Sequence, residues 1–146
     1  MGDVEPETPA PRARTRTAAQ ARGDAGERLV AEQLLAVGWQ ILGRNVHVGR
    51  SEIDVLGVDP GPPSTLVIVE VRWRRQRGYG LPEETVDWRK RRRLRAAMGA
   101  LIGAGQLPDG TRLPMLPIRI DIVALEPPRS LGDGVVLRHH RSAVGE

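Results

Sequence analysis

Apolar residues recur along the chain with two different spacings, and each spacing predicts one kind of element. Runs of valine, isoleucine and leucine that alternate with polar residues are typical of half-buried strands. Apolar residues three and four positions apart are typical of helices that pack on one face. The first pattern predicts strands at residues 39–48, 51–56, 66–72, 117–125 and 135–140, and the second predicts helices at residues 24–37 and about 85–102.

The first helix carries signals at both ends. Asp24 followed three residues later by Glu27 is the arrangement of a capping box, so we expect the helix to begin with Asp24 as its N-cap. Gly38 suits the position just beyond the last turn. Glu27 also lies at the edge of an apolar stripe that includes Val30 and Leu34. Two interpretations remain for Glu27: it only caps the helix, or it points over the sheet toward the acidic pair described next.

A hairpin at the centre of the chain holds the main candidate chemistry. Residues 59–64 have the composition of a turn and separate two strands that we expect to pair in antiparallel fashion. The turn length permits a register in which Asp54 lies opposite Glu70, about 5 Å away on the same face. Like charges in that arrangement are destabilising unless a cation sits between them, and oxygen ligands suit Mg²⁺ or Mn²⁺. The alternative is that both acids face solvent or pair with arginines.

The charge of the chain points to a polyanionic partner. The 146 residues carry a formal net charge of +4 and have an isoelectric point of about 10.8. Lys90 is the single lysine, so nearly all of the basic charge is on arginine, whose planar fork suits phosphate. Cysteine is absent, which excludes disulfides and thiolate metal sites.

Two basic segments are the candidate nucleic-acid contacts. The loop at residues 73–80 combines arginines with aromatic residues that can stack on unpaired bases, although a solvated loop is the alternative. The arginines between residues 89 and 95 form a cationic ridge on the second helix, against which a duplex backbone can lie. Lys90 falls instead on the apolar line of this helix; its side chain either snorkels from the helix end or reaches the carboxylates. The residues selected for nucleic-acid binding are Arg74, Arg75, Arg77, Arg89, Arg91 and Arg92.

Composition divides the chain into one candidate domain and two tails. Residues 1–20 are expected to be a disordered tail, because they contain little that can be buried. Residues 21–141 are expected to form a single domain, followed by a short tail at residues 142–146. No apolar run approaches membrane-spanning length, and the N-terminus lacks the apolar region of a signal peptide. We therefore expect a cytoplasmic protein with no membrane partner.

Five short motifs fall in the order seen in the YraN-like family: Gly23-Asp24-Ala25-Gly26-Glu27, Ser51-Glu52-Ile53-Asp54, Val69-Glu70-Val71-Arg72, Lys90 and Arg119-Ile120-Asp121. From about Arg22 to Leu125 the chain resembles these endonuclease-like proteins of the PD-(D/E)XK nuclease superfamily, which are similar to Holliday-junction resolvases. The resemblance implies an α/β fold with a mixed central β-sheet flanked by helices, a restriction-endonuclease-like nuclease core. It also implies that Asp54 and Glu70 bind a divalent metal with the Val71 carbonyl, and that Glu27 is an additional acid.

One position departs from the family pattern. Active nucleases of the superfamily usually have, where this chain has Arg72, a lysine that positions the attacking water. Arginine can stabilise charge on a phosphate but is a poor proton acceptor, so Lys90 is a candidate replacement. Asp121, further along the chain, is expected to pair with Arg119 or with Arg72.

These observations together predict a Mg²⁺- or Mn²⁺-dependent endonuclease that hydrolyses phosphodiester bonds, with DNA, including branched or structured DNA, favoured over RNA. The first alternative is a nucleic-acid-binding module that keeps the fold and has lost turnover. A second is an adaptor whose basic face docks on an acidic protein. Whether the protein forms a homodimer, as resolvases do, is left open. The candidate catalytic residues are Glu27, Asp54, Glu70, Arg72 and Lys90.

Overall fold

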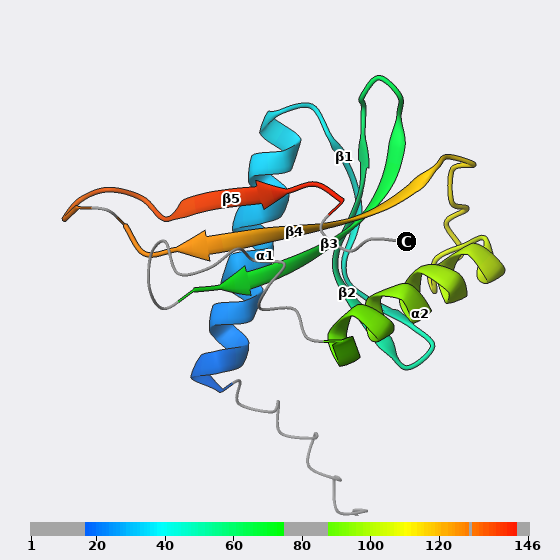
Figure 1. The fold of residues 1–146 in the computed structure, drawn as a ribbon, viewed down its shortest axis with the longest axis horizontal. Coiled ribbons are helices and arrows are strands. Elements are labelled where there is room, and N and C mark those ends of the chain that lie inside the picture. Colours follow the sequence, from blue (N-terminus) through cyan, green and yellow to red (C-terminus); the bar gives the residue numbers. More distant parts are fainter. Residues whose placement is uncertain (1–16, 75–87, 129, 143–146) are drawn as a thin grey trace, which may run out of the picture.

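The computed structural model describes residues 17–74, 88–128 and 130–142, whose arrangement is shown in Figure 1. In this part of the chain the elements follow one another as α1 (Ala18–Ala36), β1 (Gln40–Val48), β2 (Ser51–Asp59), β3 (Thr65–Trp73), α2 (Trp88–Ala104), β4 (Ile118–Glu126) and β5 (Val136–His140). The strands form one sheet in the order β1-β2-β3-β4-β5, with β3 and β4 parallel and the other pairs antiparallel. The expected α/β fold, with a mixed central sheet flanked by helices, is confirmed.

The two helices cover opposite faces of the sheet (Figure 1). Side chains alternate along each strand, so one strand contributes residues to the cores on both faces. On β3, Val67 and Val69 belong to the core under α1, which includes Val30. Ile68, between them, belongs to the core under α2, which includes Leu101. The connection from β3 to β4 contains α2, and a crossover of this kind is what allows β4 to run parallel to β3. Neither helix has an apolar run of the length that a bilayer requires, within the described part of the chain.

Helix α1 begins at Ala18, so the expected start at Asp24 is wrong. Thr17 is the N-cap: its side chain accepts a hydrogen bond from the Gln20 N–H at 3.1 Å, and the Gln20 side chain accepts one from the Thr17 N–H at 2.9 Å. This capping box precedes an alanine-rich stretch of high helix propensity, and the helix therefore starts upstream of Asp24. Glu27 consequently lies in the middle of α1, where it is buried and caps nothing.

The other end of α1 agrees with the prediction. Gly38 has a φ of +97° and donates its N–H to the Leu35 carbonyl, and the next N–H, that of Trp39, donates to the Leu34 carbonyl. These two bonds form a Schellman motif, which needs a left-handed residue and so favours glycine. Trp39 and Leu34 also share the core under α1, which fixes the path of the chain from α1 into β1.

Strand β2 positions the candidate site, because it pairs with β1 along nearly its whole length but with β3 along only part of it. In the half toward its C-terminus it pairs with β3, and Val55 opposite Val69 is the last pair of that ladder. Asp54 and Glu70 lie directly beyond this last pair, so each is the first residue of its strand outside the ladder. Before Val55 the pairing with β3 stops, whereas the pairing with β1 continues to Ser51. The two strands therefore separate at Asp54 and leave an opening in the sheet.

A second polar cluster ties β4 to the segment that contains β5. Arg119 donates to both oxygens of the fully buried Asp121, at 2.8 and 3.0 Å, and His139 Nε2 lies 2.8 Å from Asp121 Oδ2. Of the two partners expected for Asp121, the structure shows Arg119. Burial raises the pKa of Asp121, but the hydrogen bonds from His139, Arg119 and the Ser142 N–H outweigh it and hold the pKa below its ordinary value.

Candidate active site

The opening between β2 and β3 is bridged by the side chain of Asp54. Val71 lies two residues beyond Val69, the last residue of β3 in that ladder, so its N–H also points toward β2. This N–H donates to Asp54 Oδ2 at 2.9 Å. The carboxylate thus replaces the backbone carbonyl that the separated strand no longer supplies, and the hydrogen bond holds Asp54 in the opening.

Two further acids approach Asp54 from opposite faces of the sheet. Glu70 comes from β3 on the face that α2 covers, and Glu27 comes from α1 on the other face. Glu27 hydrogen-bonds with the Asp54 side chain. Its Oε2 atom is buried and has no hydrogen-bond partner among the residues that the structure describes. Glu27, Asp54 and Glu70, predicted separately from three elements, are therefore neighbours in the fold.

This crowding changes the protonation of the acids. Burial, assisted by the negative charges of Glu70 and Glu27, raises the pKa of Asp54 to about 8 against the opposing hydrogen bond from the Val71 N–H. Burial also raises the pKa of Glu27, with Glu52 adding to the effect. The cluster therefore retains a proton near neutral pH as long as no cation offsets its negative charge.

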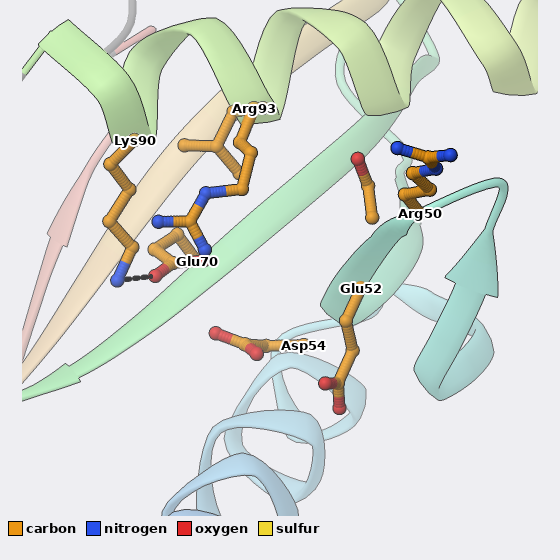
Figure 2. A pocket seen from close by; sticks show the side chains of 8 residues that line it. Arg50, Glu52, Asp54, Glu70, Lys90 and Arg93 are labelled. Atoms are coloured by element: carbon orange, nitrogen blue, oxygen red, sulfur yellow. Dashed lines mark ion pairs between the residues drawn. The ribbon is translucent and has the colours of Figure 1, made fainter.

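Lys90 brings a positive charge to the same cluster. It projects from the first turn of α2, and its Nζ atom forms an ion pair with Glu70 Oε1 (Figure 2). The Lys90 side chain is 31% exposed and that of Glu70 only 8%, so the lysine lies between the acid and solvent. Of the two interpretations of the inward-facing lysine, the structure agrees with the one in which its ammonium group reaches the carboxylates.

The acids open onto a cavity of about 290 Å³ between α2 and the β1–β2 hairpin (Figure 2). Asp54 and Glu70 line it from the strands, Lys90 and Arg93 from α2, and Arg50 from the hairpin turn. The sequence did not single out Arg50 or Arg93 as lining residues. Two signals pointed to them: Arg93 follows Lys90 by three residues and so lies on the same side of the helix, and Arg50 is in the turn that opens β2.

A second cavity, of about 540 Å³, lies on the α1 side of the opening. The acids Asp24, Glu27 and Glu52 line it, together with His47. Glu52 borders both cavities. The two sides of the opening therefore differ in charge, because the cations of the described lining residues belong to the cavity under α2.

Val71 and Arg72, the predicted site residues that follow Glu70, lie differently with respect to the acids. The N–H and C=O of a strand residue point to the same edge, so the Val71 carbonyl faces the opening together with its N–H. Arg72 shares the α2 face of β3 with Glu70 by strand alternation, but it does not line the cavity. The structure therefore brings Val71 to Asp54 and leaves Arg72 outside the cavity.

The predicted nucleic-acid contacts fall into three groups. Arg74 forms an ion pair with the buried Glu126 at 3.7 Å, and only 10% of its side chain is exposed, so it has little surface to offer a ligand. Arg75 and Arg77 lie outside the described residues. The contacts predicted on α2 are all exposed: Arg89, Arg91 and Arg92.

The donors at the opening fit a hard cation. Among the described residues, no three acidic, histidine or cysteine side chains form a preformed metal cage. Mg²⁺ does not require one, since it commonly binds through one or two carboxylates and keeps several waters. Asp54 and Glu70 supply two carboxylates, and the unpaired Oε2 of Glu27 is a buried acceptor beside them. These residues therefore suit Mg²⁺ or Mn²⁺ held together with backbone and water oxygens.

The fold and the site define an α/β protein with an acidic cluster at an opening in its mixed sheet, bordered by arginines. The chain belongs to the Uncharacterised protein family UPF0102, whose sequence profile matches residues 26–125. It is 43% identical to a UPF0102 protein of Symbiobacterium thermophilum, over 72% of this chain and 81% of that one. It is 38% identical to one of Dehalococcoides mccartyi, over 71% and 78% of the two chains. The expected membership of the YraN-like family is thereby confirmed.

Among solved structures, Pyrococcus furiosus SfsA in complex with Ca²⁺ is similar to this chain, with a TM-score of 0.38 and 18% sequence identity. The similarity covers 84% of this chain and 63% of SfsA, which is less than two thirds of that protein. A likeness at this level has no bearing on function.

Proposed function

We propose that this protein is a metal-dependent nuclease that hydrolyses phosphodiester bonds in DNA. One observation carries the proposal: the carboxyl groups of Glu27 and Glu70 both approach Asp54 at the sheet opening, and burial together with these negative charges raises the pKa of Asp54 to about 8. Opposed like charges and buried carboxylates both cost free energy of folding. An arrangement that costs stability in this way is typical of a functional site, and a divalent cation is the ligand that relieves it.

In this proposal Asp54, Glu70 and the Val71 carbonyl hold Mg²⁺ or Mn²⁺, and Glu27 is an additional acid beside them. When bound, the ion supplies a Lewis acid that activates water and offsets charge on the phosphate. Assignment of these residues to the PD-(D/E)XK pattern rests on the motifs quoted above, and the spacing of Asp54 and Glu70 across the β2–β3 hairpin supports it.

The cationic residues have separate roles in this proposal. Lys90, which pairs with Glu70 and lines the cavity, stabilises the negative charge that develops on the phosphate. The exposed arginines of the α2 ridge attract the nucleic-acid backbone without reading bases. Because this attraction releases counterions, the affinity for DNA falls steeply as salt is raised.

Cleavage assays with Mg²⁺ on branched, flapped and linear DNA test the proposal. The wild type is expected to cleave at least one of these substrates. Loss of an outer-shell partner of a metal slows an enzyme by up to roughly 100-fold. Asp54→Asn and Glu70→Gln remove proposed direct ligands, so each should slow cleavage by more than that. Glu32→Gln, an exposed acid of α1, is the matched control and should retain activity. A wild type that leaves every substrate intact, or cleavage that survives Asp54→Asn, contradicts the proposal.

One observation favours a second candidate, a nucleic-acid-binding module without turnover. Arg72 stands where active nucleases of the resembled superfamily usually have lysine, and it does not line the cavity. A metal titration separates the two candidates. If Mg²⁺ changes neither the thermal stability of the protein nor its affinity for DNA, while DNA still binds, the binding module is the better description.

A further inference from the structure

The cavity above Asp54 and Glu70 has cations on both of its walls. Lys90 and Arg93 belong to α2, and Arg50 belongs to the turn of the β1–β2 hairpin (Figure 2). Arg50 and Arg93 are exposed, whereas Glu70 is buried. A phosphate that enters the cavity therefore passes between guanidinium groups from two separate elements before it reaches the acids.

The other side of the acidic cluster repels a polyanion. The cavity on the α1 side is lined by Asp24, Glu27 and Glu52, and its described lining includes no lysine or arginine. Approach of a phosphate is consequently favourable from the α2 side. Among the described residues, the cavity of about 290 Å³ between α2 and the hairpin provides a cationic entrance to Asp54 and Glu70.

An entrance of this kind discriminates between paired and unpaired strands. Duplex DNA is stiff, with a persistence length of about 150 base pairs, so it cannot turn one phosphate into a small cavity without displacing its neighbours and its second strand. A single strand can turn at each nucleotide and can follow a positively charged groove. Because Glu70 is buried whereas Arg50 and Arg93 are exposed, a phosphate must leave the path of its strand to reach Glu70, which favours a backbone that bends sharply.

We infer that Arg50 and Arg93 clamp the phosphates of an unpaired strand, so that the substrate class is single-stranded DNA or the unpaired arm of a branched molecule. The inference rests on the proposed function for the nature of the polyanion, and it adds the form of the strand that enters. Leu94 is the one apolar residue among the described residues that line the cavity. The described part of the clamp therefore contacts the backbone of the strand rather than its bases.

Fluorescence anisotropy tests this inference with the full-length protein in EDTA, which separates binding from cleavage. A labelled oligonucleotide is compared as a single strand and as a blunt duplex. The single strand should bind more tightly by roughly tenfold, the effect of about one well-placed contact. Arg50→Ala and Arg93→Ala should each weaken binding of the single strand and lower its salt slope by about 0.7, whereas binding of the duplex should weaken less.

Arg92→Ala is the matched control, since Arg92 is exposed on the same helix and does not line the cavity. It should weaken both forms of DNA equally. Arg93→Lys keeps the charge and should keep the preference, and thermal unfolding checks that every variant is folded. Equal affinity of the wild type for the two forms, or equal weakening of both by Arg93→Ala, overturns the clamp. Either result leaves the nuclease proposal to be decided by the cleavage assay alone.

Discussion

Asp54 is the residue at which the local structure and the chemistry of this protein meet. Its carboxylate accepts the hydrogen bond from the Val71 N–H that closes the edge of the separated strand. That bond favours the anion, but burial and the charges of Glu70 and Glu27 outweigh it, and the pKa rises to about 8. The residue that completes the backbone pairing is therefore also the one that retains a proton at neutral pH.

The free energy of unfolding of the metal-free protein should accordingly decrease as the pH rises from about 4 to about 8. Across this range the unfolded chain has released the Asp54 proton at its ordinary pKa of 3.8, whereas the folded chain retains it up to about 8. The folded state binds more protons, so its stability falls with rising pH. Asp54→Asn cannot titrate and should flatten the profile, which thermal unfolding in EDTA measures.

One control variant and the pH range of the measurement separate the contribution of Asp54 from those of other acids. Asp133→Asn removes an exposed acid elsewhere in the chain and should leave the slope unchanged. Asp59 and Asp121 have lowered pKa values, so their contribution to stability is lost only as the pH falls below about 4, outside the window. Parallel pH profiles for the wild type and Asp54→Asn would show that Asp54 does not carry this proton.

Lys90 should compete with a metal ion for Glu70, because its ammonium group already pairs with that carboxylate. Lys90→Met removes the competing charge and should tighten Mn²⁺ binding by roughly tenfold, about 1.4 kcal/mol. Cleavage should nevertheless slow, since a group that stabilises the phosphate is lost. Calorimetric titration with Mn²⁺ measures the affinity, and Arg92→Met on the same helix is the control. Unchanged or weaker Mn²⁺ binding by Lys90→Met would contradict the competition.

At the scale of the elements, the sequence predicted what is decided locally. The hairpin register, the Gly38 helix end and the alternating faces of β3 and β4 all follow from neighbouring residues. The start of α1 was missed because two capping boxes compete, and an alanine-rich stretch after Thr17 favours the upstream one. The parallel pairing of β4 with β3 was not predicted, since it depends on the path of the crossover.

The residues of the candidate site also differ in whether local sequence patterns predicted them. Asp54 and Glu70 were predicted as neighbours because a short turn connects their strands. Lys90 was recognised by its position on the apolar line of α2, although its partner was left open. Arg50 and Arg93 were missed because the cavity that they line forms only when the hairpin and α2 come together, and their local signals do not predict that contact.

The contact between α1 and the end of β3 predicts a specific effect of Gly26→Ala. A Cβ atom at Gly26 would lie 2.6 Å from Trp73 Nε1 and 2.9 Å from Leu125 Cδ1. Trp73 Nε1 also donates to the Arg22 carbonyl at 3.0 Å, so moving the indole breaks a hydrogen bond. We expect a loss of about 1–3 kcal/mol in the free energy of unfolding, as for an overpacked core, measured by denaturant unfolding.

Gly23→Ala, on the same helix, is the matched control for Gly26→Ala. No atom lies within 4 Å of a Cβ built at Gly23. Replacing a helical glycine by alanine where there is space should stabilise the protein by about 0.5–1 kcal/mol. Opposite signs for the two variants indicate a packing effect at Gly26, whereas two stabilising substitutions would mean that α1 and Trp73 do not pack closely.

At the scale of the whole molecule, the opening in the sheet separates two cavities that differ in charge, in a protein that is basic overall. The net charge of +4 attracts a polyanion to the surface in general, but the acids sit where β1–β2 separates from β3. A cation bound between Asp54 and Glu70 would connect these parts of the sheet across the gap that the backbone leaves. Ligand binding and global stability are therefore expected to be linked.

Mg²⁺ should raise the melting temperature of the wild type because it binds at this opening in the folded state and not in the unfolded chain. At 100 times the dissociation constant, a ligand of the folded state stabilises by about 2.7 kcal/mol, which corresponds to roughly 5–10 °C for a protein of this size. The shift should be larger at pH 8 than at pH 6, because at the lower pH the ion must displace the proton of Asp54. The Asp54→Asn/Glu70→Gln double variant, compared with KCl at equal ionic strength, should show no shift. A shift of equal size in that variant would place the Mg²⁺ elsewhere on the protein and remove the link between the acids and the metal.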